Sequence, residues 1–186
     1  MGVGDGNGNG DGVDASPGGN GDEFADAIPA QRCSKMDILF VIDDSGSMGE
    51  EQANLASNFP QFINVLDTYQ TESGDSLDYR VAITTTGRDV DYTIQPPTIP
   101  GFPTFPPIEQ SEDGMNGAFV QDCGMTRRWL ERGDVDVSST FSCAALVGTS
   151  GPSLEMPLHA THLAFTERMS DGTNAGFLRD DALLAL

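Results

Sequence analysis

Five consecutive apolar residues, Ile38 to Ile42, are followed at once by the sequence Asp43-Asp44-Ser45-Gly46-Ser47. The apolar run has no polar alternation, which is typical of a strand buried on both faces of a parallel sheet. Asp43 then stands at the carboxyl end of this strand. In open α/β sheets, ligands bind outside the carboxyl ends of the strands, beside the helices that follow. The pattern therefore predicts an α/β fold with a functional loop at residues 43–47.

This loop has the oxygen atoms that a hard cation requires. Asp43 supplies a carboxylate, and Ser45 and Ser47 supply hydroxyls two and four residues later. Mg2+ binds such oxygens and keeps water or partner oxygens in its remaining positions. The same residues also fit an ordinary turn, because Ser47 followed three residues later by Glu50 forms a capping box. Taken alone, these residues leave a metal site and a capped turn both open.

The next segments alternate between helical and strand patterns. Apolar spacing predicts an amphipathic helix from Met48 to Leu66, with one face formed by Met48, Gln52, Leu55, Phe59, Phe62 and Leu66. Pro60 should kink this helix or split it near Asn58. Tyr79 to Thr86 is rich in β-branched residues and predicts a second strand, with Asp91 to Ile94 as a short third strand paired to it. Alternating strands and helices indicate an α/β sheet.

The second half of the chain has weaker patterns. Gln95 to Pro107 contains six prolines in thirteen residues, which predicts an extended surface loop. We expect a helical turn at Arg127 to Arg132 and a helix from Val135 to Val147. Leu154, Leu158, His162, Phe165 and Met169 predict one further amphipathic helix. Leu183 to Leu186 resembles the start of a buried strand.

Composition limits the classes of partner. Residues 1–30 hold nine glycines by residue 21 and no Lys or Arg, which predicts a disordered linker. A net charge of −20 with Lys35 as the only lysine argues against nucleic acid binding and favours cations or basic partners. No apolar stretch approaches the ~20 residues that span a bilayer. Asp5 to Gly10 opens like a calcium loop, but Ser16 replaces the required Glu, so a linker is favoured.

The cysteines and histidines favour structural roles. Cys123 and Cys143 lie in a region poor in regular pattern, where a disulfide would pin an insertion, and no Cys or His spacing supports zinc. Cys33 is left as a free thiol or pairs outside the chain. His159 and His162 are expected to serve packing and solvent contact.

The absence of a signal peptide at Met1 implies either a cytoplasmic protein or a true start further upstream, and the cysteines favour the second.

Residues 38–48 resemble the first strand and metal-ion-dependent adhesion site of a von Willebrand factor type A domain. In that family a D-x-S-x-S loop, a Thr from a later glycine-bounded loop and an Asp after the fourth strand hold the metal. Asp43, Ser45 and Ser47 match the first element, and Thr149 within residues 148–151 matches the second. The resemblance covers residues 35–186, with an insertion at about 95–132, inside a predicted domain of residues 31–186. It implies a three-layer sandwich with a mostly parallel sheet.

The resemblance also implies a function. Asp43, Ser45, Ser47 and Thr149 would hold Mg2+, with Ca2+ or Mn2+ as alternatives, and the metal would bind an Asp or Glu carboxylate of a partner protein. The related bacterial members are secreted or anchored in the cell envelope. Compared with the family, the chain stops at the start of the fourth strand, before the last metal ligand. Asp180 and Asp181 precede that strand and cannot replace this ligand, so a truncated fragment with weakened metal binding is expected.

The sequence leaves two other functions as alternatives to metal-dependent adhesion. One is a structural module of the cell envelope in which the loop is only a capped turn. The other is a serine hydrolase, with Ser45 or Ser47 as nucleophile. The sequence disfavours hydrolysis because no G-x-S-x-G elbow surrounds these serines and only two histidines are available as bases. We therefore expect a binding module and not an enzyme.

Overall fold

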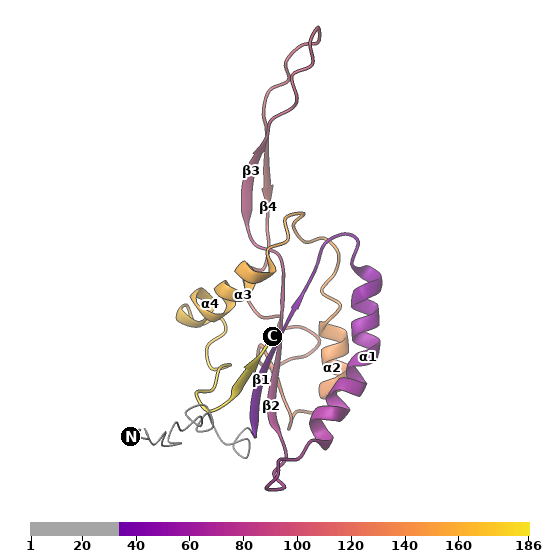
Figure 1. The fold of residues 1–186 in the computed structure, drawn as a ribbon, viewed down its shortest axis with the longest axis vertical. Coiled ribbons are helices and arrows are strands. Elements are labelled where there is room, and N and C mark those ends of the chain that lie inside the picture. The colour runs from indigo at the N-terminus through magenta and orange to yellow at the C-terminus, as the bar shows by residue number, and fades with distance from the viewer. Residues whose placement is uncertain (1–33) are drawn as a thin grey trace, which may run out of the picture. The chain divides into compact units, whose positions relative to one another are not determined.

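The computed structural model describes residues 34–186 (Figure 1). Its elements are β1 (Lys35–Ile42), α1 (Gly49–Thr68), β2 (Asp78–Thr85), β3 (Val90–Ile94), β4 (Ile108–Glu112), β5 (Leu130–Glu131), α2 (Val137–Ala144), α3 (Pro157–Phe165), α4 (Glu167–Ser170) and β6 (Leu183–Ala185). The prediction of a mixed α/β fold with a mostly parallel sheet is confirmed. The predicted linker and Cys33 lie outside the described residues.

The main sheet has the strand order β5-β2-β1-β6. β1 is parallel to β2 along its whole length, from Lys35 opposite Asp78 to Ile42 opposite Thr85. β6 is also parallel to β1, whereas β5 is antiparallel to β2. The two longest strands therefore end at the same edge of the sheet, which places the loops after them side by side.

Helices cover both faces of this sheet. Ile38 and Ile42 pack with residues of α1 and α2 on one face, whereas Leu39 packs with Phe119 and Ala164 on the other. At the centre of the first face, the fully buried ring of Phe141 stacks on Phe59, with ring centroids 3.3 Å apart. Because both faces are covered, residues 38–42 of β1 are apolar without alternation, as predicted.

α1 runs without interruption through Pro60, so the predicted split near Asn58 is wrong. Pro60 has no N–H and leaves the carbonyl oxygen of Ala56 without its usual partner in the helix. The hydroxyl of Ser142 in α2 donates a hydrogen bond of 2.7 Å to this oxygen. The packing of α2 on α1 thus satisfies the group that the proline leaves free, and the helix continues.

The short strand β3 does not pair with β2, contrary to the prediction. It forms an antiparallel hairpin with β4, from Val90 opposite Glu112 to Ile94 opposite Ile108, and this hairpin projects away from β1 and β2 (Figure 1). At its base, a Cβ on Gly114 would lie 2.3 Å from the backbone nitrogen of Arg88, so the two chain segments pass each other closely. Residues 95–107 join β3 to β4 and are an exposed loop, as predicted.

Two predicted helices differ from the structure. Residues 127–129 form a bend that leads into the strand β5, and Trp129 in this bend lies beside the guanidinium groups of Arg80 and Arg127. The helix expected over residues 154–169 is two helices, α3 and α4, which meet at Thr166. Its apolar face was also wrongly assigned. The buried residues of α3 are Ala160, Leu163 and Ala164, whereas Leu158 and His162 are exposed.

The end of the chain is partly as predicted. Residues 183–185 form a strand parallel to β1, but Leu183 and Leu184 are 43% and 47% exposed, so this strand is not buried. Asp181 forms an ion pair with Lys35, the first residue of β1. Asp181 therefore lies at the amino edge of β1, opposite the loop that begins at Asp43, as expected.

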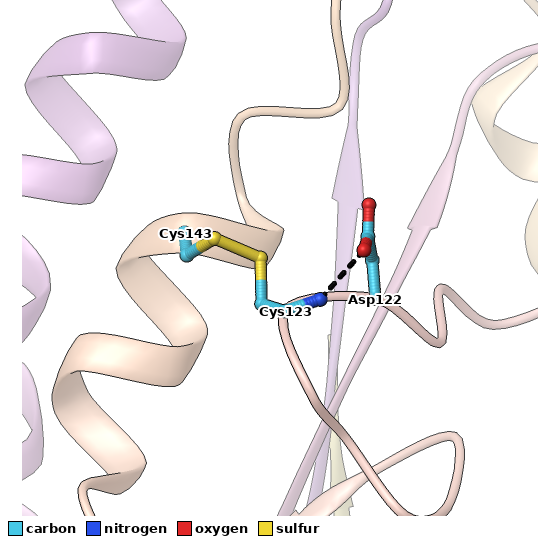
Figure 2. Close-up of a disulfide and its surroundings, with 3 residues drawn as sticks. All are labelled: Asp122, Cys123 and Cys143. Carbon is cyan, nitrogen blue, oxygen red and sulfur yellow. Dashed lines mark hydrogen bonds between the residues drawn. A yellow bond between two sulfur atoms is a disulfide. The ribbon is translucent and has the colours of Figure 1, made fainter.

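The predicted disulfide between Cys123 and Cys143 is confirmed, with the two Cα atoms 6.1 Å apart (Figure 2). Cys123 has a left-handed backbone with φ of 54°, and its N–H donates a hydrogen bond of 2.7 Å to the carboxylate of Asp122. The bridge joins the segment before β5 to α2. It thereby ties part of the predicted insertion to the helical layer.

Candidate binding site at the carboxyl edge of the sheet

The candidate site begins where β1 and β2 end together. Ile42 lies opposite Thr85, and the N–H of Thr86 donates a hydrogen bond of 3.1 Å to the carbonyl oxygen of Ile42. The buried hydroxyl of Thr86 lies 3.5 Å from a carboxylate oxygen of both Asp43 and Asp44, at the outer limit of a hydrogen bond. The register of the parallel strands thus fixes the position of the Asp43 loop.

The structure brings the loop of Thr149 beside the loop of Asp43. The buried side chain of Gln52 donates hydrogen bonds of 2.8 Å to the carbonyl oxygen of Asp43 and 2.7 Å to that of Gly148. The N–H of Gly151 donates a further bond of 2.8 Å to the carbonyl oxygen of Asp44. These three bonds hold two loops that are far apart in the sequence as one surface.

The sequence pattern places Gln52 on the predicted apolar face of the helix. It does not predict that the Gln52 side chain joins two loops. One indication was present in the sequence. A polar residue at a buried helical position needs hydrogen-bond partners, and Gln52 follows the Asp43 loop by less than three helical turns. Its amide has two N–H donors, which is the number needed to bind two carbonyl oxygens. The second partner, Gly148, lies in the loop that the family resemblance predicts beside Asp43, but nothing in the sequence indicates its hydrogen bond with Gln52.

The carboxylate of Asp43 is half-buried and held by neighbouring hydrogen bonds. The N–H of Ser45 donates to its Oδ1 at 2.8 Å. Burial raises the pKa of Asp43, but hydrogen bonds with Ser45, Glu155 and Thr86 together outweigh burial and leave the pKa below its usual value. Asp43 is therefore ionised at neutral pH. Glu155, whose side chain is exposed, is a second carboxyl group of this edge that the sequence did not indicate.

The neighbouring residue Asp44 has a different environment. It is buried, and a Cβ on Gly151 would lie 2.2 Å from its carboxylate carbon, so only glycine fits at this position. Apart from Glu155, the exposed part of the edge consists of small and hydroxyl-bearing residues, namely Gly46, Ser47, Gly148, Thr149 and Ser150. The surface offered to solvent is therefore mostly neutral, with the carboxylate of Asp43 at its base.

The capped-turn interpretation of the loop is also changed by the structure. α1 starts at Gly49 with Met48 as its N-cap, and no side chain caps the helix. The predicted capping box between Ser47 and Glu50 is therefore wrong. The hydroxyl of Ser47 is not used as a helix cap and remains on the exposed surface.

The expectation of a divalent cation as cofactor is wrong. Within residues 34–186, no three or more His, Cys, Asp or Glu side chains form a group that could hold a metal ion. The carboxylate of Asp44 packs against Gly151, and one carboxylate oxygen of Asp43 accepts the hydrogen bond from the N–H of Ser45 in its own loop. A hard cation such as Mg2+ or Ca2+ binds several oxygens in a defined shell. Asp43, Ser45, Ser47 and Thr149 remain predicted binding residues without that cation.

Comparisons with known family models, with curated proteins and with solved structures gave no match for this chain. The similarity to von Willebrand factor type A domains therefore rests on the motif residues alone and stays a prediction.

The role of Gln52 can be tested by substitution. Gln52→Leu leaves the carbonyl oxygens of Asp43 and Gly148 without their donor, and we expect the free energy of unfolding to fall by about 1–3 kcal/mol. Urea denaturation measures this loss, and amide hydrogen exchange should accelerate at residues 148–151. Gln61→Leu, at an exposed position of the same helix, is the matched control. Equal stability of the two variants would show that Gln52 does not join the loops.

Proposed function

We propose that this chain is a protein-recognition module that binds its partner at the carboxyl edge of the sheet without a resident metal ion. The observation that supports this most is the pair of hydrogen bonds from Gln52, because they hold two distant loops in one fixed arrangement. A binding surface that is ordered in advance loses less conformational entropy when a partner binds. The module keeps the binding role implied by the von Willebrand resemblance and replaces the metal with direct hydrogen bonds.

The chemistry of this edge favours a cationic partner group. Asp43 is ionised, and the side chain of Glu155 lies next to it. A Lys or Arg side chain of a partner would form charge-assisted hydrogen bonds with the carboxylate of Asp43. Ser47 and Thr149 add hydroxyls that accept or donate hydrogen bonds. We therefore propose a partner that presents a basic side chain, in place of the carboxylate expected with a metal.

Long-range electrostatics act in the same direction. The chain has a formal charge of −20, which attracts basic proteins and increases their rate of association. Ser45, one of the two alternative nucleophiles, is buried and hydrogen-bonded with Asp43. The other, Ser47, lies on the exposed surface but lacks the G-x-S-x-G elbow of a hydrolase. We therefore propose binding without catalysis.

A fold of the von Willebrand type A class is part of this proposal. It is supported by the parallel arrangement of β1, β2 and β6 and by the helix directly after the Asp43 loop.

The disulfide supports a location outside the cytoplasm. Disulfides such as Cys123–Cys143 persist in oxidising compartments and are rare in cytosolic proteins. We therefore propose that the module acts in the cell envelope or outside the cell. Among residues 34–186, none of the helices has the length and apolar character needed to span a membrane.

The partner chemistry is tested with two short peptides of opposite charge. In a titration followed by backbone amide shifts, the peptide Gly-Arg-Gly-Lys-Gly should shift the signals of residues 45–47 and 148–150. The acidic peptide Gly-Asp-Gly-Glu-Gly should leave the same signals in place. A cation beside Asp43 gains charge-assisted hydrogen bonds, whereas an anion is repelled.

Two variants separate binding at this edge from attraction to the acidic surface in general. Asp43→Asn should weaken the shifts, whereas Asp180→Asn, an exposed position that precedes β6, should leave them unchanged. Shifts spread evenly over acidic residues, or equal in both variants, would contradict the proposed site.

A further inference from the structure

The loop at the end of the β3–β4 hairpin is an apolar, uncharged surface on a strongly acidic protein. Between Asp91 and Glu109 the chain has no charged residue. Ile99, Phe102 and Phe105 are 50%, 67% and 63% exposed. We call residues 94–108 the hairpin tip. Large aromatic side chains this exposed are characteristic of surfaces that bind another molecule.

The hairpin tip is built to be stiff. The N–H of Phe102 donates a hydrogen bond of 3.1 Å to the carbonyl oxygen of Ile99, and Pro100 and Gly101 occupy the two central positions of this turn. Gly101 has φ of +86°, as a type II turn requires at its third residue. Five further prolines restrict the two arms of the hairpin tip. A restricted segment loses little conformational entropy on binding, which favours affinity.

Polar contacts fix the base of the hairpin to the candidate binding site. Glu112 accepts hydrogen bonds of 2.6 Å from both the N–H and the hydroxyl of Ser153, and one of 2.9 Å from the hydroxyl of Tyr92. Ser153 lies only four residues after Thr149. On the other side of the base, the N–H of Gly114 donates a bond of 2.9 Å to the carboxylate of Asp89. The hairpin therefore stands in a defined direction over the carboxyl edge of the sheet (Figure 1).

We propose that the hairpin tip docks into an apolar groove of a partner protein and that Lys and Arg residues surround this groove. Phe102 and Phe105 would fill the groove, since aromatic side chains in desolvated pockets contribute most to protein interfaces. This inference rests on the proposed function as a recognition module and adds a second contact that is separate from Asp43.

Charge complementarity identifies the surroundings of the groove. Below the hairpin tip, residues 90–93 and 109–113 form the stem of the hairpin. The stem has the exposed acidic residues Asp91, Glu109 and Asp113. A partner that receives the tip brings its own rim close to these carboxylates, so a basic rim is attracted and an acidic rim is repelled. The same carboxylates, together with the overall charge of −20, repel an anionic lipid surface. The charges therefore favour a protein over a membrane as the binding partner of the hairpin tip.

The test uses a displayed library of small domains with a randomised concave surface, selected against the whole chain. The selected domains should carry aromatic residues inside the concave surface and Lys or Arg at its rim. Their affinity should fall about tenfold or more for the double variant Phe102→Ser/Phe105→Ser. It should also weaken with added salt, because charges of the stem contribute. Neutral and anionic lipid vesicles, tested in parallel, should not bind.

Controls separate this inference from the proposed function and from misfolding. The double variant Val135→Ser/Leu158→Ser removes two apolar side chains elsewhere that are even more exposed, at 85% and 86%, and it should leave binding unchanged. Asp43→Asn should also leave the affinity of the selected domains unchanged, because Asp43 belongs to the separate contact at the carboxyl edge of the sheet. Failure of one proposed contact can therefore be distinguished from failure of the other. Circular dichroism checks that all variants fold. The inference is overturned if the selected domains do not depend on Phe102 and Phe105, if their rims lack basic residues, or if vesicles bind through the tip.

Discussion

Arg179→Ala is expected to lower the free energy of unfolding by about 3–5 kcal/mol, since it leaves a buried carboxylate without its charged partner. Asp37, in the centre of the sheet, is 1% exposed. Arg179 donates to it through Nε at 2.9 Å and through its backbone N–H at 2.8 Å. The same guanidinium forms an ion pair of 2.7 Å with Asp78 at the start of β2. One side chain thus ties the segment before β6 to the first residues of β1 and β2.

Chemical denaturation measures this effect, and two further variants interpret it. Arg168→Ala removes exposed ion pairs with Glu167 and Asp171, and it should cost less than about 1 kcal/mol. The double variant Asp37→Leu/Arg179→Leu should recover part of the loss, because it removes both charges together. If Arg179→Ala costs no more than Arg168→Ala, the buried ion pair does not hold this segment.

Phe141→Ala is the second substitution with a large expected effect, about 3–5 kcal/mol of unfolding free energy. Phe141 is fully buried, stacks on Phe59 and contacts the edge of Phe40 at a centroid distance of 4.9 Å. Its removal leaves a cavity between α2, α1 and β1 that these rigid elements cannot fill. Thermal denaturation should show a clear drop in the melting temperature.

Phe105→Ala is the matched control for this core substitution. The same side chain is removed, but at a position in the hairpin tip that is 63% exposed. Its stability should stay within about 0.5 kcal/mol of the unchanged protein. A small effect of Phe141→Ala, or an equal effect of both variants, would mean that the helical layer does not pack on the sheet as described.

The parts of the fold that follow local patterns could be predicted from the sequence. Most of β1 and β2 consists of β-branched or apolar residues, at 38–42 and 81–85, and the predicted bounds of β2 lie within one residue of the observed ones. The prolines in residues 95–107 prevent a regular element and predicted an exposed loop. In each case, the chain itself contains the physical cause.

Features that depend on contacts distant in the sequence could not be predicted. The hydroxyl of Ser142 keeps α1 continuous at Pro60, and nothing near Pro60 indicates it. β3 is too short for its pattern to distinguish β2 from β4 as its partner. The ion pair between Arg179 and Asp37 could not be predicted either, because a charged residue inside a strand gives no indication of its partner.

The candidate site was predicted only in part. The motif placed Asp43, Ser45, Ser47 and Thr149 in loops that the structure brings together, but it also predicted a metal that the described residues do not support. A motif gives the order of residue types and says nothing of where each carboxylate points. The packing of Asp44 beneath Gly151 was decided by the backbone of a distant loop.

The most direct test of metal-free recognition is to measure the affinity of the peptide Gly-Arg-Gly-Lys-Gly in EDTA and again with added Mg2+. Without a resident cation, the peptide should bind in EDTA at residues 45–47 and 148–150, and Mg2+ should leave its affinity unchanged or weaken it slightly through screening. The account would be contradicted if the basic peptide fails to bind in EDTA, or if the acidic peptide binds at these residues only when Mg2+ is present.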